Sequence, residues 1–546
     1  MSSDGGSMLI SEFKGIQQYH DGRPVSDYCN MIPLGNSVID RHGETELASY
    51  THDRTAVETF VDSLGNIYVA GLHAVRKYAK GSVSARTLLT NDDGYSPDPD
   101  NGRFVTFAES STKPSQVYIC DGAHVWYWNT QDADVTADKI VPMYANRYKA
   151  FEAFRIQFPI EPPEDWKQIP NPNQTDGKIT EYIGWPKTVT GKEHIINSIG
   201  WFDNRLVLVE KNKNTVWLSA VDPSRWFTPS YEAGGKLYPF AIYQPIDSEH
   251  PNTAINSLFP NYYASTASSA NIQDIVAFAG QLYFLNDTSI EVWSATGNDQ
   301  NPIQHNSQNT LYYGGRSPVI VDDTLYLLCK GAIHNDFIAA ISQTGQITRI
   351  SNDEIDKMLM PRAYRIRPLA VRDQSMIVVY TDKYYMNGYA VTKAGAWWRY
   401  WNDDNEAIAW SVVNQDGRQI GVSRFGTLAE AVESNRQFIN GKSILRQIRG
   451  GWSQYTGRKI LREVEIVCDT GIYLDTESAP GNVFLRVSFD RGNNFGSYVY
   501  RRLGISSKND KVLLWRNCGS GNSLLMEFGT SDNIRLQIYG LRFELS

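Results

Sequence analysis

The chain has 546 residues and a net charge of −8, and its content of 41% hydrophobic and 21% charged residues is that of an ordinary globular protein. Aromatic residues make up 12%, and they occur beside 42 Gly and 23 Pro, a mixture that favours strands and tight turns over helices. The first residues lack a basic segment leading into an apolar run, and no stretch of about 18 apolar residues follows. We therefore expect synthesis in a cytoplasm and no membrane span.

The five cysteines are far apart in the sequence and include no CxxC pair. None of the nine histidines lies at ligand spacing from them, so the sequence predicts scattered reduced thiols and no zinc site.

Charge is distributed unevenly along the chain. Residues 442–546 carry 15 Lys and Arg against 10 Asp and Glu, whereas residues 1–440 carry 37 against 50. Tight binding of nucleic acid needs concentrated basic residues, so an acidic body with a mildly basic end argues against DNA as a firmly held ligand. It does not argue against DNA passing by.

A short phrase recurs along the chain, in which a tight polar turn separates two apolar or aromatic alternating runs. Each copy predicts a β-hairpin. The copies are TFVDSLGNIYVAG (59–71), QVYICDGAHVWYWN (116–129), SIGWFDNRLVLVE (198–210), DIVAFAGQLYFLN (274–286), PVIVDDTLYLLC (318–329), MIVVYTDKYYMNGYAV (376–391) and AWSVVNQDGRQIGV (409–422).

The spacing of these hairpins predicts a β-propeller of six or seven blades over residues 1–440. The turn residues Gly280, Asp323, Asp373 and Asp416 are separated by 43, 50 and 43 residues, close to the length of one four-stranded blade. Wider steps in the first half predict insertions near 150–190 and 229–270, which we expect to lie on the surface and to make functional contacts.

Two further elements are predicted towards the C-terminus. ISNDEIDKML (350–359) predicts a short helix capped by Ser351 or Asn352 and packed on a blade. Residues 445–546 predict a separate antiparallel, sandwich-like β-domain, since NVFLRVSFD and NIRLQIYGLRFEL each place alternate apolar residues on one face.

Residues 198–359 contain, in order, WFDNRLVLVE, VWLSAVDPSRWF, IVAFAGQLYFLNDTSIEVWSATG, YYGGRSPVIVDDTLYLL and ITRISNDEID. This succession resembles the packaged-DNA-stabilising tail hub or nozzle proteins of short-tailed bacteriophages. The residues that match the phrases of this family are Ile290, Glu291, Val292, Trp293, Gly297, Ile350, Ser351, Asn352, Ile355, Asp356, Ala220, Asp222 and Pro223.

The resemblance implies a structural virion protein, located in the phage tail, without catalytic activity, cofactor or metal. It implies a homohexameric ring below the portal adaptor, or head-to-tail connector, that retains packaged DNA and forms its exit channel. The implied partners are the portal adaptor, a tail needle or tip plug, and tailspikes or tail fibres. DNA would pass through the lumen without sequence-specific binding.

Partner contacts are expected from the insertions and the basic C-terminal domain. The candidate partner-contact residues are Trp166, Tyr182, Tyr238 and Tyr243.

Two other functional classes remain open on the sequence alone. One is a carbohydrate-active or receptor-binding propeller of the glycosidase or sialidase kind, because the chain has enough Arg, Tyr and Asp to supply such a site. The other is a cellular propeller scaffold for protein contacts. The acidic loop DDGYSPDPDNG (92–102) also leaves a calcium site open, although it lacks EF-hand spacing and its two prolines favour a solvated loop.

The aromatic clusters VWYWN (125–129) and WWRYW (397–401) offer two interpretations. They could stack against sugars or single-stranded nucleic acid, but alternate aromatic residues in strands more often fill the core between blades. Arg399 is expected to stack on a neighbouring ring and hold a blade edge.

The stretch SFDRGNNF (488–495) has the spacing of the Asp-box turn found in sialidases. Those enzymes repeat the box in several blades and away from the active site, whereas this single copy lies in the predicted C-terminal domain. It therefore predicts a structural turn, in which Ser488 and Asp490 accept backbone N–H groups, Gly492 is left-handed and Phe495 packs underneath.

Overall fold

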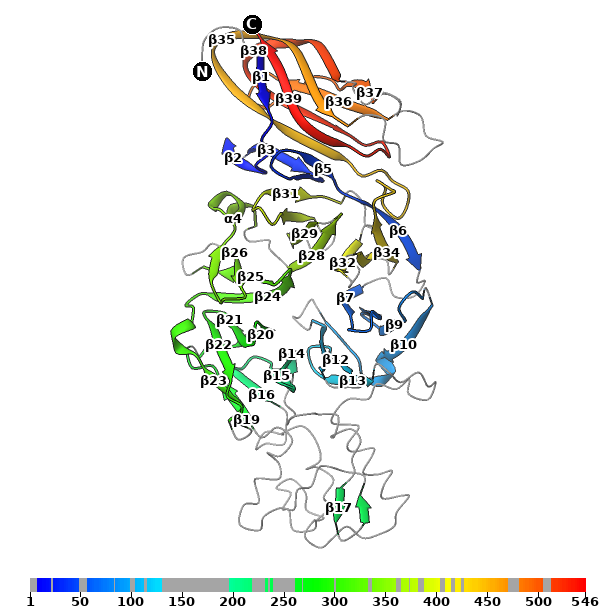
Figure 1. Cartoon of the computed structure of the whole chain (residues 1–546), viewed down its shortest axis with the longest axis vertical. Helices are drawn as coiled ribbons and strands as arrows, with labels where there is room; N and C mark the ends of the chain where they lie inside the picture. Colours follow the sequence, from blue (N-terminus) through cyan, green and yellow to red (C-terminus); the bar gives the residue numbers. More distant parts are fainter. Residues whose placement is uncertain are drawn as a thin grey trace.

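The structure is a computed structural model whose described residues form an almost entirely β protein (Figure 1). The described residues are 7–20, 23–48, 56–82, 84–98, 104–111, 115–129, 196–218, 231–233, 236–238, 261–267, 269–298, 301–331, 336–359, 365–372, 374–381, 387–402, 408–413, 418–423, 427–469, 481–503 and 512–546.

Seven antiparallel sheets in these ranges surround one axis as the blades of a propeller (Figure 1). The β-propeller fold is thus confirmed, and each predicted hairpin phrase lies in a different blade. The strands of blades 1 to 4 are β7 (Ala56–Val61), β8 (Ile67–Gly71), β9 (Ala74–Tyr78) and β10 (Ala85–Thr90); β11 (Thr106–Glu109), β12 (Gln116–Cys120) and β13 (Val125–Asn129); β14 (Ile196–Phe202), β15 (Arg205–Glu210), β16 (Thr215–Leu218) and β19 (Asn261–Ala264); and β20 (Ile272–Phe278), β21 (Gln281–Asn286), β22 (Ile290–Ala295) and β23 (Ile303–His305).

Blades 5 to 7 continue the same arrangement, and the last blade takes its outer strand from the N-terminal part of the chain. Their strands are β24 (Gly314–Val321), β25 (Thr324–Lys330), β26 (Asp336–Ser342) and β27 (Ile347–Arg349); β28 (Arg365–Val371), β29 (Gln374–Tyr380), β30 (Gly388–Val391) and β31 (Trp397–Tyr400); and β32 (Ile408–Val413), β33 (Gln419–Ser423), β34 (Leu428–Val432) and β6 (Gly43–Ala48). Because β6 pairs with β34, the ring is closed by strands from opposite ends of the sequence.

The turns and the core follow from residue type. Gly65 and Gly280 have φ of 85° and 72°, which glycine adopts without strain, in hairpins that begin blades 1 and 4. Trp126, Trp397 and Trp398 are buried, so these three side chains fill the core as predicted, whereas Trp401 is 36% exposed.

The predicted helix is present as α4 (Asp353–Leu359). The Asn352 side chain accepts the N–H groups of Glu354 and Ile355 and thereby caps its first turn. Ile355 and Leu359 are fully buried between blades 5 and 6, so the helix packs on the propeller.

The C-terminal β-domain contains strands from both ends of the chain (Figure 1). Its strands are β35 (Arg446–Cys468), β36 (Asn482–Ser488), β37 (Val499–Arg502), β38 (Leu513–Thr530) and β39 (Gln537–Leu545), joined by β1 (Ser7–Ile10), β2 (Gln17–His20), β3 (Arg23–Cys29), β4 (Met31–Pro33) and β5 (Val38–Asp40). β1 and β5 pair with β39, and β3 pairs with β35. The predicted division into residues 1–440 and 445–546 therefore differs from the observed pairing, which joins the N-terminal strands to the C-terminal domain.

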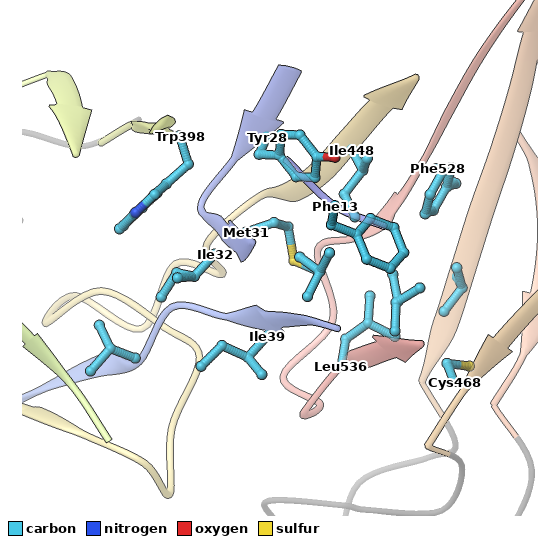
Figure 2. Packing of buried hydrophobic residues seen from close by; sticks show 14 of the residues in the cluster. Phe13, Tyr28, Met31, Ile32, Ile39, Trp398, Ile448, Cys468, Phe528 and Leu536 are labelled. Carbon is cyan, nitrogen blue, oxygen red and sulfur yellow. The ribbon is translucent and has the colours of Figure 1, made fainter. Parts of the chain in front are cut away.

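The same sheet is continuous with the propeller. Strand β3 forms a parallel bridge to β31 of blade 6, where Cys29 lies opposite Arg399, and pairs on its other side with β35. Figure 2 shows the core at this junction, where Phe13, Met31 and Ile39 pack towards Phe528 and Leu536. Apolar residues of the two ends of the chain thus share one core.

The insertions are described only in part. Strands β17 (Tyr231–Ala233) and β18 (Lys236–Tyr238) form a hairpin within the second insertion. Strand β19 pairs with β16, so residues 261–264 belong to blade 3 and the predicted boundary at residue 270 is too late. Residues 150–190, the predicted first insertion, lie outside the described residues.

The five cysteines are free thiols, in agreement with the predicted reduced state. Among the described residues, no helix has the length and apolarity needed to cross a membrane.

Candidate functional site

A cluster of charged side chains lies where the inner strands of the propeller face its axis. Strand β7 has a β-bulge between Ala56 and Glu58. The carboxylate of Glu58 forms ion pairs with two arginines of β28, with Arg365 Nη2 at 2.8 Å and with Arg367 Nη2 at 2.6 Å. The guanidinium of Arg365 also lies 5.3 Å from the ring centroid of Phe104, just before β11. Side chains of blades 1, 2 and 6 therefore contact one another along one side of the propeller's inner surface.

The chemistry of this cluster is that of a structural ion pair. Glu58 and Arg367 are 7% and 8% exposed, and burial together with the neighbouring Arg365 lowers the pKa of Arg367. Asp274 on β20 accepts a hydrogen bond from Ser198 Oγ at 2.7 Å, and burial raises the pKa of its carboxyl group.

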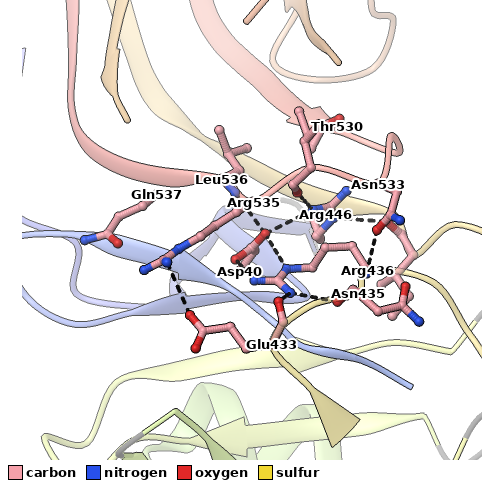
Figure 3. Close-up of polar contacts among 12 residues, drawn as sticks. Asp40, Glu433, Asn435, Arg436, Arg446, Thr530, Asn533, Arg535, Leu536 and Gln537 are labelled. Carbon is pink, nitrogen blue, oxygen red and sulfur yellow. Dashed lines mark hydrogen bonds and ion pairs between the residues drawn. The ribbon is translucent and has the colours of Figure 1, made fainter. Parts of the chain in front are cut away.

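A second charged cluster joins the propeller to the C-terminal domain (Figure 3). Asp40, at the end of β5, accepts hydrogen bonds from Arg436 Nε at 2.8 Å and Nη2 at 3.1 Å, from Arg446 Nη1 at 3.0 Å and from the backbone N–H of Leu536 at 2.9 Å. The three charged side chains are fully buried. Burial alone would raise the pKa of Asp40, but the two guanidinium groups outweigh it and hold that pKa below its ordinary value.

The surroundings of Asp40 contain further titratable groups. Glu433 lies 3.4 Å from Arg372 Nε and 3.3 Å from Arg535 Nη1 at the more exposed rim of the cluster. Burial, reinforced by Arg436, lowers the pKa of His42 to about 4. The interior of the junction is thus charged, and its stability depends on the ionisation state of these groups.

Two polar contacts on the other side of the junction reinforce it. Asn30, with φ of 54°, donates from Nδ2 to the carbonyl oxygens of Trp401 at 2.8 Å and Leu445 at 2.9 Å, and so connects the end of blade 6 to the start of β35. Arg399 pairs with Asp27 of β3 at 2.8 Å and lies 5.3 Å from the Trp401 ring. The predicted stacking of Arg399 is therefore present, and its pairing adds a link between blade 6 and β3.

The turn after β36 is held by side-chain acceptors. Ser488 Oγ accepts the N–H of Gly492 at 2.9 Å and Asp490 Oδ1 accepts the N–H of Asn494 at 2.8 Å, while Gly492 has φ of 84°. The N–H of Asn494 and the Ser488 hydroxyl, which donates to Asp490 Oδ1 at 2.7 Å, lower the pKa of Asp490. Phe495, expected to pack beneath the turn, is half-buried.

This turn borders a groove with a volume of about 780 Å³. The guanidinium of Arg486 lies between two rings, 4.7 Å from the centroid of Phe495 and 4.6 Å from that of Tyr498, and pairs with buried Glu527. The groove is lined by apolar, polar and basic residues, which include Arg458, Phe489, Val499, Trp515, Arg516 and Cys518.

The predicted partner-contact residues remain predictions. Trp166, Tyr182 and Tyr243 lie outside the described residues, and Tyr238 ends β18, where its backbone pairs with Tyr231.

Sequence reasoning did not identify the Asp40 cluster. Its one local signal is VIDRHGE (38–44), in which consecutive ionisable residues follow a strand that is buried throughout. The two arginines that neutralise Asp40 lie about 400 positions away, at 436 and 446, so spacing could not connect them.

One segment of the chain matches a known family model. Residues 251–396 match the family model described as "Phage_stabilise: Bacteriophage P22 Gp10, beta-propeller". This segment is similar to a phage tail-stabilising β-propeller. The matched range begins before β19 of blade 3 and ends one residue before β31 of blade 6. It overlaps residues 198–359, in which the sequence phrases resemble the phage family.

Similar solved structures are distant. A streptogramin B lyase structure is 10% identical, with 71% of this chain and 97% of that chain covered and a TM-score of 0.38. A chain of the mitotic checkpoint complex is 10% identical, with 72% of this chain and 90% of that chain covered and a TM-score of 0.36. The AfRom2 CNH domain is 9% identical, with 71% of this chain and 98% of that chain covered and a TM-score of 0.34. No curated protein matches this chain. None of these likenesses indicates a function.

Proposed function

We propose that this chain is a structural virion protein, the hub or nozzle of a short phage tail. The observation that carries the proposal is the match of residues 251–396 to the phage tail-stabilising propeller family. The proposed ring lies below the portal adaptor, retains packaged DNA, forms its exit channel and opens on infection.

The proposed DNA channel is formed between protomers. A homohexameric ring would enclose this channel between copies, as closed cyclic symmetry allows. The acidic body of residues 1–440 suits such a lining, because like charge keeps the duplex from adhering.

The junction between propeller and C-terminal domain fits a load-bearing role. A continuous sheet through β3 and the buried Asp40 pairs fix the two parts relative to each other, so force on one part reaches the other without a flexible linker. We propose a mechanical and steric role without catalysis, with the portal adaptor, a needle or tip plug, and tailspikes or fibres as partners.

Electron microscopy of the purified protein with its portal adaptor tests this proposal. Closed six-fold rings seated on the adaptor are expected. A persistent monomer that fails to bind the adaptor would contradict it, and a monomer that also hydrolyses chromogenic glycosides would favour the carbohydrate-active alternative.

A further inference from the structure

Strand β37 is an edge strand with an unusually exposed surface. Among the described residues it pairs with β36 alone and ends the sheet. All four of its side chains are exposed, and Val499 and Tyr500 are 46% and 56% exposed. Natural sheets usually protect such edges, since an exposed apolar edge strand readily pairs with another chain.

The backbone of β37 presents hydrogen-bonding groups outwards. The N–H of Leu503 donates to the carbonyl oxygen of Gly481 at 2.9 Å, so residue 503 faces the strand that precedes it in the sheet. Amide directions alternate along a strand, so residues 499 and 501 also face β36, while Tyr500 and Arg502 direct N–H and C=O groups towards the open edge. Arg501 Nη1 already donates to the carbonyl oxygen of Tyr500 at 3.0 Å, so an incoming strand would pair with the outward N–H groups and share that carbonyl.

Aromatic side chains on this edge form a preassembled surface. Tyr498 lies 5.0 Å from Phe484 and 6.3 Å from Tyr500 between ring centroids, and the guanidinium of Arg486 lies over the Tyr498 ring. Val499 lines the 780 Å³ groove. Apolar side chains of an added strand could therefore contact aromatic rings on one side and enter the groove on the other.

The charge of this surface selects an acidic partner. Arg501 and Arg502 lie on the strand, and Arg458 and Arg516 line the groove beside it. Arg501 donates to the carbonyl oxygen of Leu514 at 3.0 Å, and Arg516 pairs with Glu463 at 3.3 Å. The acidic lining residue Asp490 already accepts hydrogen bonds within its own turn. Basic groups thus outnumber acidic ones around the edge.

We infer that β37 binds an extended, acidic segment of another tail protein by β-strand addition. Main-chain hydrogen bonds to Tyr500 and Arg502 supply affinity, and the arginines with the groove supply specificity. A second copy of β37 is the less favoured occupant, because pairing across a two-fold axis would bring Arg501 and Arg502 of both copies together. The identity of the partner as a tail protein rests on the proposed function.

Photo-crosslinking in assembled particles tests the inference. Phage is produced with Tyr500 replaced by p-benzoylphenylalanine, and purified particles are irradiated and analysed by peptide mass spectrometry. Unmodified peptides of this chain report whether it is a virion component, which tests the proposed function separately. Crosslinks from position 500 to an acidic segment of a different virion protein are expected.

Two matched variants test the strand-addition geometry. Tyr500→Pro removes one outward N–H without removing a β36–β37 hydrogen bond, whereas Tyr500→Thr keeps that N–H and the strand propensity. At equal thermal midpoints, the proline variant should carry at least tenfold less of the crosslinked partner per particle, and the threonine variant should retain it.

Several outcomes would overturn the inference. In particles that contain this chain, an absence of crosslinks, or crosslinks only to another copy of it, would do so. Equal partner content in the proline and threonine variants would refute strand addition. Particles that lack this chain altogether would reject both the proposed function and this partner. If the proline variant does not fold, the crosslinking result alone decides.

Discussion

His42 should make the stability of this protein depend on pH between about pH 6.5 and pH 4. Its side chain is 8% exposed beside the Asp40 cluster, and burial lowers its pKa from 6.5 to about 4. The unfolded chain therefore binds a proton below pH 6.5 that the folded chain excludes until about pH 4. Stability is present above the unfolded pKa and falls as the pH drops through this window.

The size of the effect follows from the two pKa values. Linkage gives a loss of about 2 kcal/mol at pH 5 relative to neutral pH, rising to about 3 kcal/mol at pH 4. The depressed pKa of Asp40 acts separately, because that carboxylate loses its contribution below about pH 4. The interval from pH 7 to pH 5 therefore separates the effect of His42 from that of Asp40.

Urea unfolding followed by tryptophan fluorescence at pH 7, 6 and 5 measures this effect. We expect the free energy of unfolding of His42→Gln to fall by about 2 kcal/mol less than that of the wild type between pH 7 and pH 5. The comparison uses changes with pH, so any uniform cost of the substitution cancels. Parallel curves for the two proteins would refute the assigned role of His42.

Three substitutions test other parts of the structure. Asp40→Ala leaves two buried arginines uncompensated and should lower the free energy of unfolding, measured in urea, by about 3–5 kcal/mol. A double variant that also replaces Arg436 by Met should restore most of this loss. Gly529→Ala would place a Cβ 2.0 Å from a backbone carbonyl oxygen and should cost roughly 3 kcal/mol or more, whereas Gly450→Ala, with open space around its Cβ, should change thermal stability little. Ser488→Ala removes the acceptor for a buried N–H and should cost about 1–3 kcal/mol, measured as a thermal shift, with local hydrogen exchange increasing across the turn.

The blades were predictable because each hairpin is encoded locally. In blade 3, Asp203 and Asn204 turn the chain with φ of 48° and 57°, and the apolar runs on both sides then pair with each other. Repetition of this unit at blade-length spacing predicted the propeller without any knowledge of distant contacts.

Ring closure and the domain boundary depend on pairs that local patterns do not reveal. GETELA (43–48) alternates weakly, yet it forms the outer strand of blade 7 against residues 428–432. SMLI (7–10) is short and pairs with residues 541–544. Partners for such strands are selected by the geometry of the assembled sheet, which no single stretch of sequence records.

The turn at 488–495 was predictable for a different reason. Ser488, Asp490 and Gly492 interact within five residues, so their spacing alone specifies the hydrogen bonds. The position of the Phe495 ring could not be predicted from this spacing, because the ring contacts Arg449 and Arg486 from other strands. Their guanidinium groups lie 5.4 Å and 4.7 Å from its ring centroid. A side chain at the rim of a turn follows its tertiary neighbours more than its local sequence.

The topology explains how a propeller could resist force without a disulfide. The segment between β5 and β6 connects a strand paired with β39 to the strand that closes blade 7, and Asp40 at its start is held by arginines 436 and 446 on the far side of the sequence. Pulling the C-terminal domain away from the propeller would have to separate buried charges and break the β3 ladder together. Buried ion pairs add little to equilibrium stability compared with apolar packing, but separating them is costly. The junction is therefore better suited to resisting separation under load than to raising the free energy of unfolding.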